Sequence, residues 1–302
     1  MIDNVPKFLI KLLEKQYGEN IAKEILKGYK SKRKVTIRAN TIKTNMANVK
    51  SELAKGNIEY ETVLWNEDAL ILNNAKENDI RNLKLYQNGE IYLQSLSSML
   101  PPIILNPKQD MDILDMCAAP GGKTTQIAAL SENKSHITAC EMNHIRMERL
   151  KYNIEKQGAS CVYVMQKDAR TIDDFFSFDS VLLDAPCSGS GTLNMDDSKL
   201  EKTFTINLIN KCKNAQLQLL KKAIKVLKPG REMIYSTCSM LSCENEEILN
   251  SVLKTEKVEI VPINFEGIED LPLLPTEIAG TLCVCPNELY EGFFIAKIRK
   301  TF

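Results

Sequence analysis

The sequence predicts an α/β protein whose larger part is a doubly wound, mostly parallel sheet. From Met111 onward, short β-rich apolar runs alternate with longer runs of helical periodicity, a pattern typical of such sheets. Strands are expected at 111–116, 136–141, 162–167, 180–184, 233–237, 257–263 and 292–299, and helices at 124–131, 144–157, 205–227 and 243–254. Pro229-Gly230 is expected to end the long helix before the strand that starts at Met233.

The first ninety residues follow another pattern, which predicts a small α+β unit. Apolar residues at helical spacing indicate two short helices, punctuated by Gly18 and Gly28. A strand at 35–38, a helix at 48–55 and strands at 58–64 and 69–72 follow, and the unit ends near residue 89. We therefore expect one domain at 1–92 and a second at 93–302, joined through a bridge at 94–102.

Composition excludes several classes of protein. With 44% hydrophobic and 26% charged residues, the chain has the balance of a soluble globular protein. No apolar run approaches the roughly 20 residues of a membrane span, and the N-terminus lacks the pattern of a secretory signal. Nine cysteines without a Cys-x-x-Cys pair and only two histidines argue against a disulfide framework and against a metal site. We expect a cytoplasmic protein with reduced thiols and no metal.

The zero net charge hides an uneven distribution of charge. Residues 1–50 hold 12 Lys and Arg against 4 Asp and Glu, a net charge of +8, which leaves −8 for the remainder. A basic N-terminal region suits a polyanion partner, although a solvated lysine-rich face would give the same count. The densest part comprises Lys27, Lys30, Lys32, Arg33, Lys34 and Arg38.

The most informative segment is the turn from Asp115 to Lys123, with the sequence DMCAAPGGK. It joins an expected strand to an expected helix, so several free N–H groups and a helix N-terminus meet in one crevice. Such a crevice suits the polar part of a nucleotide-like cofactor. The turn is not a P-loop, because Cys117 stands where that motif has its first glycine, and Gly-x-Gly-x-x-Gly is absent.

Two acidic residues follow the next strands. Glu141 is placed to accept the hydroxyls of a ribose, and Asp168 to reach an adenine amino group. A single acid at a strand end is commonly a helix cap or a turn former. Two acids in register after a glycine turn favour a cofactor crevice.

Two cysteines, Cys187 and Cys238, follow two further strands in polar turns. Adjacent parallel strands would bring both thiols to one rim. Cysteine is also a small buried hydrophobe, and we accept that reading for Cys140, Cys161 and Cys212. A thiolate that adds to carbon 6 of cytosine makes carbon 5 nucleophilic toward an electrophilic methyl group, with an acid beside ring nitrogen 3. The second thiol could assist product release, and the base must be unstacked.

These motifs resemble those of the Nol/Nop/Sun family of S-adenosylmethionine-dependent RNA (cytosine-5)-methyltransferases. The likeness runs through most of the chain. Its motifs are Cys117-Ala118-Ala119-Pro120-Gly121-Gly122-Lys123, Asp184-Ala185-Pro186-Cys187-Ser188-Gly189 and Tyr235-Ser236-Thr237-Cys238-Ser239 with Glu244-Asn245-Glu246, and, more weakly, Arg38-Ala39-Asn40-Thr41, Gln94 to Met99 and Gly292 to Ala296.

The resemblance implies a Rossmann-like methyltransferase sheet with an antiparallel last strand, preceded by a small α+β RNA-binding unit. Cys238 would attack carbon 6, Cys187 would assist product release, Asp184 would face the cytosine, and Lys123 would hold the site together by charge and hydrogen bonding. The residues implied around S-adenosylmethionine are Cys117, Ala118, Ala119, Pro120, Gly121, Gly122, Lys123, Glu141, Arg146, Asp168 and Asp184.

The chain departs from the family pattern in two places. Thr192 to Asp197 replaces a stretch that often carries arginines, so Lys199 or Lys202 is expected to supply the phosphate contact. Arg231 replaces a second glycine after Pro229-Gly230. Residues 1–50 and the catalytic face are expected to hold the RNA.

Three other functions stay open. A DNA cytosine methyltransferase would attack through Cys187, which leaves Cys238 without a role. A catalytically silent RNA-binding or ribosome-assembly factor would not need Cys187, Cys238 and Asp184. A small-molecule methyltransferase would not need the basic N-terminal region. Ribosomal RNA is preferred over transfer RNA as substrate, without a residue-level reason, and the protein is expected to be a monomer.

Overall fold

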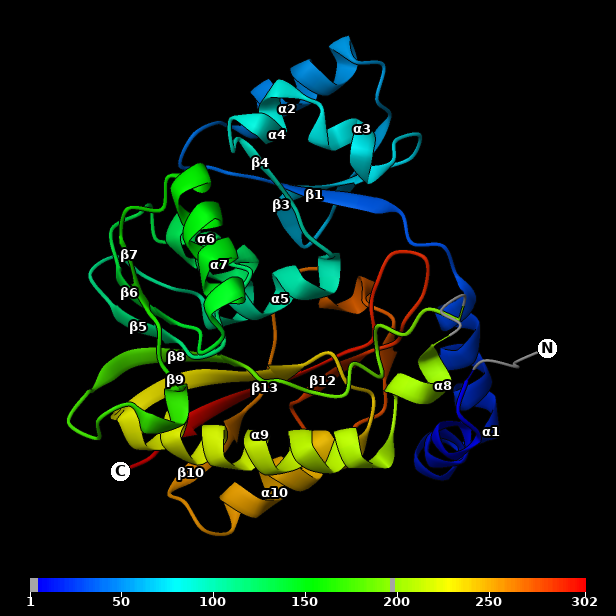
Figure 1. The fold of residues 1–302 in the computed structure, drawn as a ribbon, viewed down its shortest axis with the longest axis vertical. Helices are drawn as coiled ribbons and strands as arrows, with labels where there is room; N and C mark the ends of the chain where they lie inside the picture. The colour runs from blue at the N-terminus through cyan, green and yellow to red at the C-terminus, as the bar shows by residue number, and fades with distance from the viewer. Residues whose placement is uncertain (1–4, 196–198) are drawn as a thin grey trace.

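The computed structural model describes residues 5–195 and 199–302, and its larger part is an α/β sandwich. Among these residues, nine strands form one sheet in the order β11-β12-β13-β9-β8-β5-β6-β7, and β10 also pairs with β13 (Figure 1). Strands β5 to β9 are parallel, whereas β13 runs antiparallel to β9. The Rossmann-like sheet with an antiparallel last strand is therefore confirmed. The strands are β5 (Asp112–Asp115), β6 (His136–Cys140), β7 (Val162–Met165), β8 (Phe178–Asp184), β9 (Leu227–Thr237), β10 (Val258–Val261), β11 (Leu273–Leu274), β12 (Leu282–Val284) and β13 (Phe293–Lys300).

Helices cover both faces of this sheet because its strands alternate apolar side chains between them. Ile113 packs with α5 and α6 on one face, and Leu114 packs with α9 and α10 on the other. The helices are α5 (Leu96–Leu105), α6 (Gly122–Leu130), α7 (His144–Gln157), α8 (Leu200–Thr203), α9 (Ile206–Val226) and α10 (Glu246–Leu253). None of the helices in the described ranges has both the length and the apolar character that crossing a bilayer demands.

Helix α5 lies where the sequence suggested only a bridge. Pro101 and Pro102 stand inside it, and proline removes a backbone donor and commonly breaks a helix. Here the Gln94 side chain donates to the carbonyl of Ser98 (3.1 Å), which Pro102 leaves without its helical partner. Burial of Met99 and Leu100 in the core supplies the remaining stabilisation.

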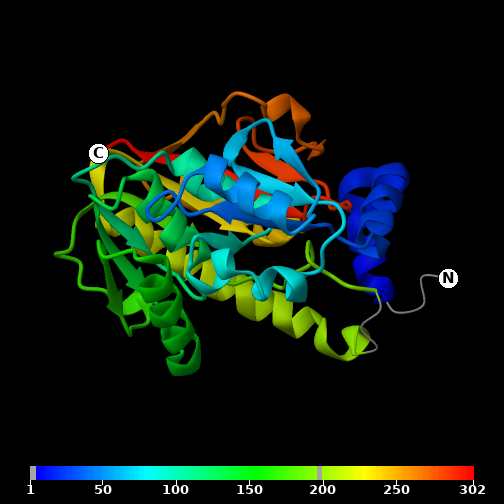
Figure 2. The same ribbon diagram turned by 90° about the horizontal axis from the view of Figure 1, so that it is seen from above.

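The N-terminal unit is a four-stranded antiparallel sheet with its own small core. Its strand order is β2-β3-β1-β4; the unit lies above the larger domain in Figure 1 and in front of it in Figure 2, which is seen from above. The strand β4 and the two short helices α3 and α4 were not expected from the sequence. The elements are β1 (Val35–Ala39), α2 (Met46–Lys55), β2 (Tyr60–Val63), β3 (Asn66–Leu72), α3 (Glu77–Arg81), α4 (Lys84–Gln87) and β4 (Ile91–Leu93).

Helix α1 (Lys7–Lys30) does not pack on this small unit. It breaks at Gly18, where φ is +80°, so the two helical segments expected there are present, and the second continues past Gly28. Leu9 and Leu13 join the core of the larger domain, and the Tyr17 hydroxyl donates to the carbonyl of Met240 (2.9 Å). Figure 1 accordingly shows α1 away from α2–α4, whereas the sequence grouped them together.

The long helix and the strand after it meet differently from the expectation. Helix α9 ends at Val226, before Pro229-Gly230, as predicted. Strand β9 starts at once, at Leu227, rather than at Met233. A register shift opposite Phe178 accommodates these extra residues, an irregularity that local sequence patterns do not signal.

Candidate active site

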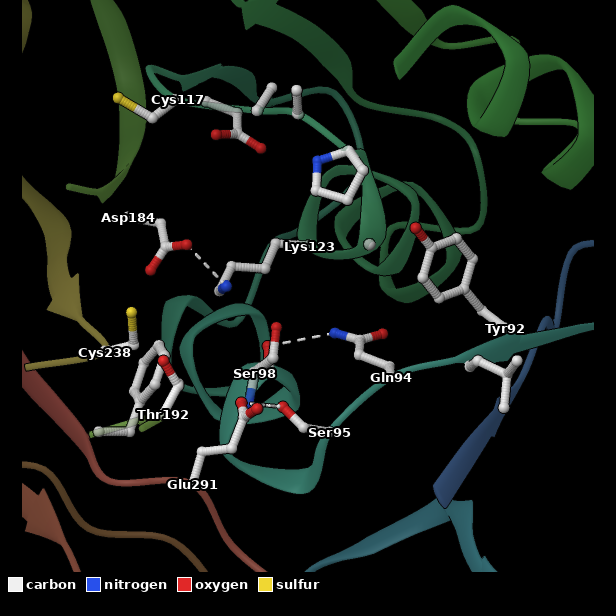
Figure 3. A pocket seen from close by; sticks show the side chains of 17 residues that line it. Tyr92, Gln94, Ser95, Ser98, Cys117, Lys123, Asp184, Thr192, Cys238 and Glu291 are labelled. Atoms are coloured by element: carbon white, nitrogen blue, oxygen red, sulfur yellow. Dashed lines mark hydrogen bonds and ion pairs between the residues drawn. The ribbon is translucent and has the colours of Figure 1, made fainter. Parts of the chain in front are cut away.

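The carboxyl ends of the parallel strands bring the predicted site residues to one rim of the sheet. Asp184 is the last residue of β8, Glu141 follows β6 and Cys238 follows β9. Two adjoining cavities open on this rim, of about 450 and 310 Å³. Figure 3 shows the first of them. Both are lined by Cys117, Ala119, Asp184 and Cys238.

The turn before α6 needs its glycines. Gly121 has φ +109°, and a Cβ there would meet the Leu150 side chain at 3.0 Å, which strains any larger residue. A Cβ on Gly122 would lie 3.1 Å from the ring of Tyr92. Arg146 donates to the carbonyl of Ala119 (2.8 Å). The turn is thereby fixed by α7 on one side and by the N-terminal unit on the other.

The two expected thiols meet in the structure. The sulfur atoms of Cys187 and Cys238 are 3.1 Å apart. The contact with Cys238 and burial raise the pKa of the Cys187 thiol well above its ordinary value. Cys187 therefore keeps its proton when Cys238 ionises, because two thiolates cannot share so short a contact.

A cation lies beside these thiols. Lys123 Nζ is 2.7 Å from Asp184 Oδ2, and the Ser236 hydroxyl donates to Asp184 Oδ1 (2.8 Å). Burial alone would lower the pKa of Lys123, but the charge of Asp184 and its hydrogen bond raise it above its ordinary value. In Figure 3 the Lys123 side chain extends between Asp184 and Cys238. A fixed positive charge in this position stabilises negative charge that develops on a bound ligand.

A set of buried hydrogen bonds joins the loops that carry the two thiols, and we call it the buried clasp: Ser188, Ser239, Glu244 and Asn245. The Glu244 carboxylate accepts from the backbone N–H (2.7 Å) and the hydroxyl of Ser188, and from the hydroxyl of Ser239 (2.6 Å). Asn245 donates to the carbonyl of Ser239 (2.9 Å). The sequence marked Glu244-Asn245-Glu246 as a motif but gave it no role. Its position five to seven residues after Ser239 could not reveal that it reaches the loop of Cys187.

The second cavity holds the other predicted acids. Glu141 is buried, accepts from the backbone N–H of Asn143 (2.8 Å) and lies 3.4 Å from Arg146. Asp168 lines the same cavity, but its carboxylate already accepts hydrogen bonds from Arg170, the shortest at 2.6 Å. These bonds lower the pKa of Asp168. Arg170 was missed in the sequence, because a cation two residues after an acid carries no distinctive spacing.

Asp115 is a further candidate to which the sequence gave no role of its own. It is buried at the end of β5, and its Oδ1 has no hydrogen-bond partner. Burial raises its pKa to about 6, although a hydrogen bond from Thr124 opposes this shift. A buried carboxylate oxygen without a donor fits a ligand that brings a cation or an N–H group.

Several predicted RNA contacts lie in other surroundings. Arg38 is almost completely buried, and its guanidinium donates to Gln94 (2.9 Å) and Thr125 (3.2 Å). It therefore does not belong to a solvated basic surface. Arg231, which was noted only as a departure from the family pattern, pairs with Asp179 (3.2 Å). Lys202 lies in α8, and Lys199 immediately precedes that helix. Asp196 and Asp197 lie outside the described residues.

Comparison with known proteins identifies the family. The model of the 16S rRNA methyltransferase RsmB/F family matches residues 102–299, and that of an RsmF/B-like ferredoxin-like domain matches residues 5–79. The chain belongs to the RsmB/F methyltransferase family. It is 34% identical over 276 residues to ribosomal RNA small subunit methyltransferase F of Shewanella sp. strain ANA-3, which covers 88% of this chain and 56% of that protein.

Two other relatives extend the comparison. The probable ribosomal RNA small subunit methyltransferase B of Bacillus subtilis is 31% identical over 98% of this chain and 66% of its own length. The chain therefore spans between about half and two thirds of these two relatives. The crystal structure of NSun6 from Pyrococcus horikoshii with SFG superposes with a TM-score of 0.89 over all of both chains at 24% identity, which shows a shared fold.

The residues present fit the cofactor of this family, which is S-adenosylmethionine, of which SFG is an analogue. The unpartnered oxygen of Asp115 suits the ammonium group of the methionine part. Glu141, buried at the end of β6, suits the ribose hydroxyls. The N-terminal end of α6, which follows Gly121, suits the carboxylate.

Proposed function

We propose that the protein is an RNA (cytosine-5)-methyltransferase that acts on ribosomal RNA. The observation that carries this proposal is the pair of sulfur atoms 3.1 Å apart, beside the ion pair of Lys123 and Asp184. Both cysteines line the cavity that also holds Glu141. The names of the two curated relatives support ribosomal RNA as the substrate.

The reaction begins at Cys238, whose thiolate forms a bond to carbon 6 of an unstacked cytosine. The electron pair displaced from the C5–C6 double bond moves toward N3, where the Lys123–Asp184 ion pair (Nζ to Oδ2, 2.7 Å) offers a hydrogen-bond donor that stabilises the developing charge. S-adenosylmethionine supplies the electrophilic methyl group that carbon 5 attacks.

Release of the product requires that carbon 5 lose its proton and that the C6–S bond break. Cys187, protonated because its pKa is raised by Cys238 and burial, passes its proton to the sulfur of Cys238 as that bond breaks. The Cys187 sulfur takes the proton from carbon 5 in the same step, so that the C–H electron pair re-forms the C5–C6 double bond and the C6–S pair leaves with the Cys238 sulfur. Both cysteines end as thiols, and Cys238 loses one proton to solvent before the next cycle.

Transfer of tritiated methyl from labelled S-adenosylmethionine to unmethylated 16S ribosomal RNA tests this proposal. We expect the label in 5-methylcytidine after digestion to nucleosides, and none with Cys238→Ala. Purified transfer RNA and DNA serve as competing substrates. Label in another nucleoside, or incorporation that survives Cys238→Ala and disappears only with Cys187→Ala, would reject the assignment.

A further inference from the structure

A groove outside the active site separates the N-terminal unit from α7. It has a volume of about 770 Å³, larger than either cavity described above. One wall consists of α3, α4 and β4, and the other is the exposed face of α7. We call it the side groove and define it by Arg81, Tyr86, Tyr92, Arg149, Tyr152 and Lys156.

The side groove continues into the candidate active site. Tyr92, Leu93 and Pro120 line both the groove and the cavity that holds Lys123 and Cys238. Figure 3 shows Tyr92 on the side of that cavity away from Cys238. A bound polymer with one residue beside Cys238 can therefore place the neighbouring residues in the groove.

Aromatic rings stand on both walls of the groove. Tyr152 is 61% exposed on α7, and Tyr86 lies opposite on α4. Lys156 Nζ lies 3.6 Å from the centroid of the Tyr86 ring and 5.8 Å from that of Tyr152. Tyr86 is half-buried. An exposed ring such as that of Tyr152, with a cation nearby, is part of a stacking platform for single-stranded nucleic acid.

The groove also carries unneutralised positive charge. Within the described residues, neither Arg149 nor Lys156 has a carboxylate at ion-pair distance, whereas the groove's acid, Glu148, pairs with Lys151 (3.2 Å). Burial, together with the charges of Arg81 and Lys43, lowers the pKa of Lys156. An anionic occupant would relieve this repulsion.

We propose that the side groove binds unpaired RNA nucleotides that flank the methylated cytosine, with a base stacked on Tyr152 and phosphates beside Arg149 and Lys156. The choice of occupant rests on the RNA methyltransferase function proposed above. Stacking tolerates any base, because every base presents a π-face, so the groove contributes affinity and places the target cytosine rather than reading sequence.

Fluorescence anisotropy with a 12-nucleotide single-stranded RNA, one cytidine flanked by uridines, tests the stacking. The whole chain is used without S-adenosylmethionine, so that binding is measured apart from chemistry. Tyr152→Ala should weaken binding at least about fivefold, as loss of one stacked base does. The matched control is Tyr163→Ala on β7, where the ring is 66% exposed but outside the groove, and its Kd should change less than twofold.

The salt dependence of binding tests the phosphate contacts. Arg149→Ala should reduce the slope of log K against log salt by about 0.7, the value for one phosphate on a single strand. Lys151→Ala, on the same helix but paired with Glu148, should leave the slope unchanged. Equal affinities for Tyr152→Ala and Tyr163→Ala would overturn the proposal and leave the groove to another class of partner. If Tyr152→Ala binds RNA more weakly but the wild-type protein forms no 5-methylcytidine, the proposed methyltransferase function is rejected, whereas RNA binding in the side groove is supported.

Discussion

At the scale of a single residue, we expect Asp115 to lower the stability of the folded protein and to contribute to ligand binding. Its carboxylate is buried beside the cofactor crevice with one oxygen unpartnered, and burial raises its pKa from 3.8 to about 6. The folded protein therefore binds this proton more tightly than the unfolded chain does. The buried negative charge lowers the free energy of unfolding. This destabilisation is fully present above pH 6 and is lost as the pH falls toward 4.

Asp115→Asn should accordingly stabilise the protein without cofactor, by at most about 3 kcal/mol at pH 8. The gain should be about half as large at pH 5, because part of the native Asp115 population is already neutral there. Urea denaturation at both pH values measures it. The same substitution should weaken binding of S-adenosylmethionine in calorimetry. A variant less stable than the wild type at pH 8, or one that binds the cofactor equally well, would contradict this account.

At the scale of elements, the geometry of the thiols depends on two loops rather than on two side chains. The buried clasp ties the loop after β8 to the loop after β9 through the Glu244 carboxylate. The loops are also joined by the backbone, since Gly191 N donates to the carbonyl of Cys238 (2.8 Å). We infer that Glu244 is a positioning residue that keeps the sulfur atoms in contact.

Glu244→Gln should lower kcat more than it raises KM, and should reduce the free energy of unfolding by about 1–3 kcal/mol. The amide NH2 would face the N–H and hydroxyl of Ser188, so one of these buried donors would lose its acceptor. Glu246→Gln is the matched control, because Glu246 is equally buried but has an unpartnered Oε2 and a pKa raised by burial. That control should be neutral or stabilising. An equal loss of kcat in both variants would contradict a specific positioning role for Glu244.

At the scale of the whole molecule, the N-terminal unit is fastened to the larger domain by buried polar groups. Asn40 donates to the carbonyls of Gly89 (2.8 Å) and Gln157 (2.7 Å), the second of which ends α7. Arg38 reaches Thr125 of α6. These contacts fix the walls of the side groove relative to the candidate active site.

Asn40→Ala should therefore loosen the attachment of the unit without destroying either core. It leaves two buried carbonyls without a donor, which costs about 2 kcal/mol. Hydrogen–deuterium exchange should speed up in β4 and at the end of α7. Asn48→Ala, which removes only the exposed hydrogen bonds of the Asn48 side chain to Thr44 and Glu90, should leave these rates unchanged. An identical response of both variants would argue against a fastening role.

The sequence predicts those features that depend on neighbouring residues. The apolar strands from Met111 onward, the glycines of the 115–123 turn and the two cysteine turns could all be placed, because strand ends in a parallel sheet share one edge. Contacts between distant segments could not be predicted. The packing of α1 on the larger domain and the reach of Glu244 to the loop of Cys187 depend on the complete fold.

The most direct test of the central claim is mass spectrometry of Cys187→Ala incubated with S-adenosylmethionine and unmethylated 16S ribosomal RNA. With Cys238 able to attack and product release impaired, an RNA nucleotide should stay covalently attached to the peptide that contains Cys238. The Cys187→Ala/Cys238→Ala double variant should carry none. An adduct on another residue, or none while the wild type still forms 5-methylcytidine, would contradict the proposed use of the two thiols.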